Sequence, residues 1–194
     1  MDGTPVRWWD GVVRPWSPQP DNLKLPFQDG HAITHNIAAE GSSEIGNMRI
    51  SLTRTDNTPI VQNSNFNQTT FNTNSTLKVT SKVNLSLAAS YMDYHRLNSP
   101  LLGEDAQSFN KGLLYSWPRS YMGEDLMSYQ NANGTRNPQT GFPYLYVDRY
   151  LWWNYYNHNT TLDRSKLLGG FTLDYQIQPW LKFMGRTGID FTND

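Results

Sequence analysis

The chain has 194 residues, of which 37% are hydrophobic, 17% charged and 13% aromatic, and its net charge is −1. A charge so close to zero gives no electrostatic reason to expect a nucleic acid as partner, and the absence of cysteine excludes disulfides and thiolate metal sites. No apolar run approaches the roughly 18 residues of a transmembrane helix, and the mean hydropathy is −0.65. A helical membrane protein is therefore excluded.

A proline-rich opening with Trp8, Trp9 and Trp16 shows no signal-peptide pattern. After it, six segments alternate between apolar and polar residues, which predicts β-strands with one apolar face. These segments are 33–39, 48–52, 71–79, 83–91, 167–177 and 181–191. None of their apolar positions is Asp, Glu, Lys or Arg. Lipid-facing positions need this, since a charge near the middle of a membrane costs roughly 2–4 kcal/mol.

The connections between these strands alternate between short and long. The short ones are 42–47, 80–82 and 178–180, and the long ones are 56–68 and 93–163. Outer-membrane barrels have tight periplasmic turns and extended extracellular loops, so we expect an all-β, antiparallel transmembrane barrel segment. A strand of about ten residues tilted by 45° covers about 23 Å, close to the roughly 25 Å apolar band of such barrels. A soluble β-sandwich, which also alternates, is the alternative.

This interpretation makes the apolar faces lipid-exposed and predicts a set of lumen-facing residues. They are Asn84, Ser86, Thr172, Asp174, Lys182 and Arg186. If the short turns are periplasmic, residues 1–30, 56–68 and 93–163 lie together outside the cell.

Enzyme signals are weak, and we expect no catalytic, cofactor-binding or metal site. The acidic pairs at 104–105 and 124–125 fit solvated loop charges better than glycosidase carboxylates. His31 and His35 are four residues apart in a predicted strand, about 13 Å, which is too far for one zinc ion. The segment 131–137 fits an Asn-Gly turn better than a calcium loop.

The long connection 93–163 is dense in aromatic residues interleaved with Asn, Arg and Gly. Aromatic rings stack on the apolar faces of sugars, so this loop is a plausible glycan-binding surface; alternatively its rings form the loop's own core and a docking face for a partner. The candidate substrate or partner contacts are Trp117, Tyr121, Tyr150, Trp152, Trp153, Tyr155 and Tyr156.

Several stretches resemble consecutive landmarks of SusC-like TonB-dependent outer-membrane transporters. They are the opening Met-Asp-Gly, LPFQDG at 25–30, the strand with Asn36 that runs into GSSE at 41–44, RISL at 49–52, WLK at 180–182 and GRTGID at 185–190. The resemblance spans almost the whole chain, and the landmarks occur in family order.

The resemblance implies a plugged barrel of about 22 strands that imports glycans or oligopeptides, is energised through TonB and works with a SusD-like surface lipoprotein. No TonB box or plug is present in these 194 residues. We therefore expect residues 1–194 to be an interior fragment of one barrel domain in the bacterial outer membrane, in contact with lipid and substrate. The alternative function is a secreted, soluble, lectin-like β-sandwich that binds carbohydrate.

Overall fold

The computed structural model describes residues 5–7, 13–100, 128–137, 149–157 and 159–194. They form two compact units. The sheet unit (31–58, 65–96 and 161–194) contains six long strands: β3 (His31–Ser43), β4 (Gly46–Thr58), β5 (Asn65–Thr80), β6 (Val83–Leu97), β7 (Thr161–Gln178) and β8 (Leu181–Asn193). The loop unit (1–30, 59–64 and 97–160) contains β1 (Pro5–Arg7), β2 (Val13–Pro15), the 3-10 helix η1 (Pro20–Lys24) and helix α2 (Arg149–Asn157).

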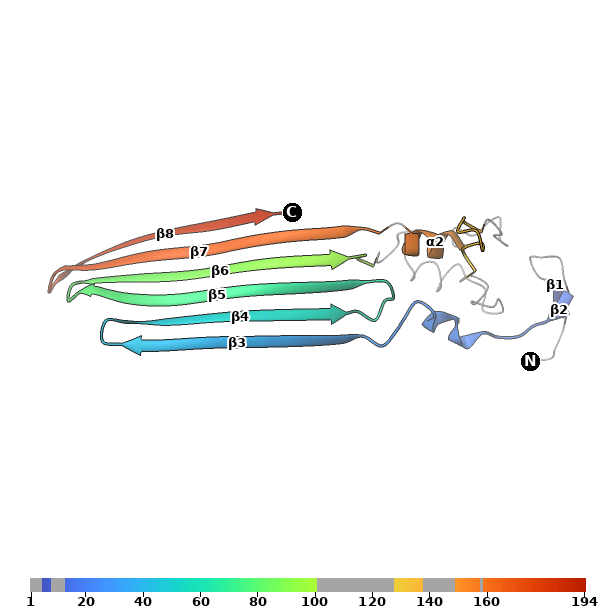
Figure 1. The fold of residues 1–194 in the computed structure, drawn as a ribbon, viewed down its shortest axis with the longest axis horizontal. Helices are drawn as coiled ribbons and strands as arrows, with labels where there is room; N and C mark the ends of the chain where they lie inside the picture. Colours follow the sequence, from blue (N-terminus) through green and yellow to red (C-terminus); the bar gives the residue numbers. More distant parts are fainter. Residues whose placement is uncertain (1–4, 8–12, 101–127, 138–148, 158) are drawn as a thin grey trace. The chain divides into compact units, whose positions relative to one another are not determined.

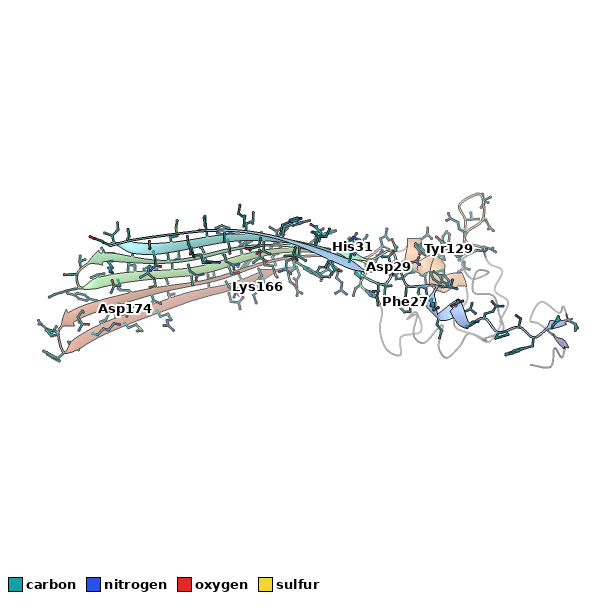
Figure 2. The ribbon with its side chains drawn as sticks, turned by 90° about the horizontal axis from the view of Figure 1, so that it is seen from below. Phe27, Asp29, His31, Tyr129, Lys166 and Asp174 are labelled. Carbon is teal, nitrogen blue, oxygen red and sulfur yellow. The ribbon has the colours of Figure 1, made fainter. Side chains whose placement is uncertain are left out.

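The six long strands form one antiparallel meander in the order β3-β4-β5-β6-β7-β8 (Figure 1). The prediction of an all-β antiparallel sheet is thus confirmed, as is each of the six strands. The sheet is open: among the described strands, β3 and β8 each pair with one neighbour, and the sheet is not closed into a barrel. Figure 2, turned by 90°, shows the six strands as a single layer.

Every strand is longer than predicted, with 13 to 18 residues. The additional residues lie mostly at the ends away from the short turns, where polar residues such as His31 and Thr58 still pair across the ladder. The predicted loop 56–68 therefore shrinks to 59–64, and 93–163 to 98–160. The alternation of short and long connections is retained, because two-residue turns at 44–45, 81–82 and 179–180 join the other ends.

The register places the apolar residues of the first three strands on one face. Ile37 lies opposite Leu52, and Leu52 lies opposite Phe71 on its other side. Directly opposed residues point to the same face of an antiparallel sheet. Residues Glu40 and Arg49, which point to the other face, form a cross-strand ion pair of 2.7 Å.

The same division continues to the far edge. The hydroxyl oxygens of Thr76 and Ser86 lie 3.5 Å apart, which joins the polar faces of β5 and β6. On the other side of the sheet, Ser165 donates a 3.4 Å hydrogen bond to Asp93, which joins the apolar sides of β6 and β7. Leu167 in turn pairs with Phe191 in β8. All six predicted apolar faces therefore lie on one common side, which we call the apolar face.

The side opposite the apolar face is predominantly polar. It carries all six residues predicted to face a lumen, because they alternate with the apolar set in β6, β7 and β8. Asp174 and Lys182 form a 2.7 Å ion pair there, and Lys166 and Asp190 form one of 3.6 Å. Asp174 and Lys166 are labelled along β7 in Figure 2. We call this side the polar face.

Neither face of the sheet is covered within its unit. No residue of 31–58, 65–96 or 161–194 is buried, and large apolar side chains stay open to solvent, with Ile37 71% and Phe183 52% exposed. A soluble sheet normally packs one face against a second layer to form a core. The sheet unit has no such core of its own.

Charged residues on the apolar face occur only near the ends away from the short turns. Arg54 and Asp56 form a 2.8 Å ion pair there, Asp93 lies nearby, and His95 contacts Asp163 across β6 and β7. Between this charged margin and the short turns, no position on the apolar face is Asp, Glu, Lys or Arg. We call this charge-free zone the apolar band. None of the helices in the described part of the chain is both long and apolar enough to cross a membrane.

Candidate functional site

The aromatic residues of 128–137 and 149–157 form the core of the loop unit. They pack together with residues 59–64, which connect β4 to β5 and which we call the strap. The strap pairs with the segment 25–28: Gln28 donates its backbone N–H to Ile60 O at 2.7 Å, and Gln62 donates its own to Pro26 O at 3.1 Å. The side chain of Pro26, whose carbonyl takes part in this pairing, is fully buried. Two segments far apart in sequence are thereby held together.

Helix α2 supplies the apolar centre of the unit. Among the described residues, Trp152 is the one large apolar side chain that is buried, with 0% of its surface exposed. Its ring stacks on that of Tyr156, four residues later on the same helix face, with centroids 6.1 Å apart. Tyr156 also stacks on Tyr129 at 5.4 Å and meets the edge of Tyr155 at 5.7 Å. These rings form one continuous aromatic cluster.

Polar bonds connect the aromatic cluster to the strap. Tyr156 donates its hydroxyl to Gln62 Oε1 at 2.6 Å, and Tyr155 donates its hydroxyl to Gln62 O. Asn63 Nδ2 donates to Tyr155 O at 2.8 Å. Burial raises the pKa of both phenols, because a tyrosinate would lose solvation there. Both side chains therefore remain protonated donors at neutral pH.

Tyr129 reaches the cluster from a small hairpin at 128–137. Asn137 donates its N–H to Tyr129 O at 2.8 Å, and Asn131 donates its N–H to Thr135 O at 2.8 Å. The turn between them is closed by Gly134 at φ 82°, a conformation that favours glycine. The predicted Asn-Gly turn is confirmed.

The two ends of the connection 98–160 are bonded to each other. Asn98 donates its N–H to Thr160 O at 2.8 Å and accepts the N–H of Thr160 on its side-chain oxygen at 2.9 Å. Asn98 also donates its side-chain amide to Asn63 O at 2.8 Å. Its left-handed φ of 50° is one that Asn tolerates better than most residues. We call this arrangement the clasp.

The structure brings together four of the seven predicted contact residues. Trp152 is buried, whereas Trp153, Tyr155 and Tyr156 are half-buried beside it. Tyr150 belongs to α2, but its side chain lies outside the described residues, as do Trp117 and Tyr121 altogether. The contact role of all seven stays a prediction. A fully buried Trp152 fits the interpretation that part of the aromatic set is the loop's own core.

Sequence reasoning missed the central position of Gln62. Nothing in the spacing around a polar loop residue distinguishes it, so no sequence signal points to it. The stacked pair at 152 and 156 does have a signal, since the i, i+4 spacing of two rings favours a helix. The acidic pairs at 104–105 and 124–125 lie outside the described residues, and no group of three or more His, Asp or Glu in the described part could hold a metal ion.

Comparison with known proteins adds no family assignment. A scan against protein-family models and a search of curated proteins found no significant match to the chain.

Proposed function

We propose that this chain forms part of the wall of an outer-membrane β-barrel, in a SusC-like TonB-dependent transporter that imports glycans or oligopeptides. The observation that carries the proposal is the apolar band: across six strands, the uncovered apolar face has a charge-free zone, and the opposite face is polar. Lipid is the partner that covers such a face without a second protein layer.

Energetics support lipid as the covering phase. Each charge near the middle of a bilayer costs roughly 2–4 kcal/mol, and the cost falls towards the membrane surface. The charged margin at Arg54, Asp56 and Asp163 fits this depth dependence, because it lies at one end of the strands. A solvated face has no reason to exclude charge from its centre alone.

The dimensions of the apolar band also support a membrane span. In β7 the band runs from Leu167 to Ile177, about 33 Å of strand at 3.3 Å per residue. A tilt of 45° converts this to about 23 Å of membrane thickness, close to the roughly 25 Å apolar zone of such barrels.

The polar face then lines a water-filled lumen, where ion pairs such as Glu40–Arg49 remain solvated. The two-residue turns face the periplasm and the loop unit faces the outside, where its aromatic residues meet a substrate or a SusD-like lipoprotein. TonB acts through a plug that lies elsewhere in the transporter. The protein moves its substrate without altering it chemically.

Single nitroxide labels on the two faces test the proposal directly. Because the chain has no cysteine, Leu87→Cys and Ser86→Cys place a label on the apolar and the polar face of β6. In lipid vesicles containing the full-length protein, the label at 87 should collide with oxygen and be protected from a water-soluble nickel complex. The label at 86 should show the reverse. Shielding of position 87 from both reagents would indicate a packed core and hence a soluble sandwich.

A further inference from the structure

The aromatic cluster leaves only part of its ring surface available to a ligand. Tyr156 has near-parallel neighbours in Trp152 and Tyr129, with interplanar angles of 12° and 5°, and meets the edge of Tyr155. Its hydroxyl is bonded to the strap. Tyr156 and the buried Trp152 therefore lie in the interior of the cluster, where the faces of their rings cannot bind a ligand.

Tyr129 and Trp153 form the edge of this cluster. Their rings meet edge to face, with centroids 6.4 Å apart and planes inclined by 67°, and Tyr129 also stacks on Tyr156. Both side chains are half-buried, and Tyr129 belongs to a hairpin whose other described residues are mostly exposed polar ones. Among them, Gln130 and Asn131 donate their side-chain nitrogens within the hairpin, and their side-chain oxygens are acceptors. Apolar ring faces next to amide groups are what a sugar requires, because its C–H face stacks and its hydroxyls form hydrogen bonds.

We propose that Tyr129 and Trp153 form a sugar-stacking face, and that Gln62 is the residue that positions it. This inference rests on the proposed transport function and narrows the substrate contact to two rings. It moves the contact away from Trp152, which the structure buries.

The positioning role follows from the bonds of Gln62, whose four polar groups are all engaged. Its backbone N–H donates to Pro26 O at 3.1 Å, and its carbonyl accepts the hydroxyl of Tyr155. Its side-chain nitrogen donates to Leu25 O at 2.9 Å, while its side-chain oxygen accepts the hydroxyl of Tyr156 at 2.6 Å. One side chain thus links the segment 25–28 to α2.

Gln62 acts on the sugar-stacking face through Tyr156. The hydrogen bond to Oε1 fixes the direction of the Tyr156 ring, and Tyr129 stacks on that ring at 5.4 Å. Loss of the bond frees the phenol to rotate, so Tyr129 loses its supporting surface. Leucine at position 62 removes all three side-chain bonds, to Leu25 O, Phe27 O and the Tyr156 hydroxyl, while keeping nearly the same volume.

Gln28 offers a matched control for this substitution. It is also a glutamine that bonds the strap, but its side chain makes one exposed bond, to Pro59 O at 3.0 Å, and does not reach α2. The variants Gln62→Leu and Gln28→Leu are made in the full-length protein, each with Ser64→Cys as a reporter. Ser64 lies in the strap and is 5% exposed, so its reaction with a maleimide reports loosening of the strap.

The binding probe is a fluorescent mixture of gluco- and manno-oligosaccharides of four to eight units. Gln62→Leu should raise the rate of maleimide reaction at position 64 at least tenfold and weaken binding of this probe at least tenfold. Gln28→Leu should change neither quantity. Tyr129→Ala should weaken binding equally without raising the maleimide rate, and Tyr129→Phe should restore binding because the ring is kept.

Equal maleimide rates in the two glutamine variants would overturn the positioning role. Binding of the sugar mixture by Tyr129→Ala at the original strength, or no binding by the unsubstituted protein, would overturn the stacking face. The transport proposal is judged separately by the nitroxide labels on β6, so the two failures are distinguishable.

Discussion

A lysine placed in the centre of the apolar band should reveal whether lipid covers it. Leu87 lies four residues from Val83 and four from Tyr91, the apolar limits of β6. Each distance is about 13 Å along the strand, or about 9 Å along the membrane normal at a 45° tilt. In the proposed membrane orientation Leu87 lies near the midplane, and its side chain is 44% exposed in the sheet unit.

Leu87→Lys should lower the free energy of unfolding by about 2–4 kcal/mol, the cost of a lysine at that depth. This corresponds to a change of about 30- to 700-fold in the unfolding equilibrium. The control is Ser86→Lys, one residue away on the polar face, which should change the free energy of unfolding by no more than about 0.5 kcal/mol. Both free energies are measured by urea unfolding of the full-length protein in lipid vesicles. The folded fraction is read from the different gel mobilities of heated and unheated protein.

Equal effects of the two substitutions would refute the reasoning. Two small losses would mean that both faces meet water, and two large losses would mean that both are buried in protein. Only a large loss at 87 with a small one at 86 fits a wall with lipid on one side and a lumen on the other.

Three further predictions concern other features of the sheet and the loop unit. A Cβ at Gly46 would overlap the β5 backbone, so Gly46→Ala should cost about 1–3 kcal/mol in the same unfolding assay, whereas Gly41→Ala, with no atom within 4 Å, should cost nothing; equal urea midpoints would contradict this. Ala89→Trp, on the apolar face, should change the free energy of unfolding by no more than about 0.5 kcal/mol, because lipid chains can rearrange around the larger side chain. A loss of about 1–3 kcal/mol would favour a packed protein core. Burial raises the pKa of Tyr155 and Tyr156, so their hydrogen bonds to the strap should stay intact below the ordinary phenol pKa of about 10 and be lost as the pH rises further. The measurement is tyrosinate absorbance, compared with that of the Tyr155→Phe and Tyr156→Phe variants. A tyrosinate signal below about pH 10 that is present in the unsubstituted protein and absent from these variants would contradict the prediction.

The sheet was predictable from sequence because its two faces differ in chemistry. Alternation with period two appears in the amino-acid sequence wherever one face is apolar, so all six strands were identified and the register confirms a common face. The strand ends were underestimated for the same reason. Around His31 and Thr58 both faces are polar, yet the backbone ladder continues, because its hydrogen bonds do not depend on the side chains.

The loop unit was predictable in composition but not in geometry. The density of aromatic residues in 93–163 indicated a cluster, and four of the seven predicted residues do lie together. Gln62 escaped prediction because its importance comes from contacts with residues about 35 positions before it and about 90 after it. No local pattern encodes an encounter of that kind.

The clasp between Asn98 and Thr160 has a consequence for how the connection 98–160 can vary in length and sequence. Extending a connection from the length of 59–64 to that of 98–160 adds only about 2 kcal/mol of closure entropy, since the cost grows with the logarithm of length. Two hydrogen bonds at the base already join its ends, at 2.8 and 2.9 Å. The segment between these two residues is therefore exchangeable: a new segment grafted there would change the surface of the loop unit without shifting the pairing of β6 and β7.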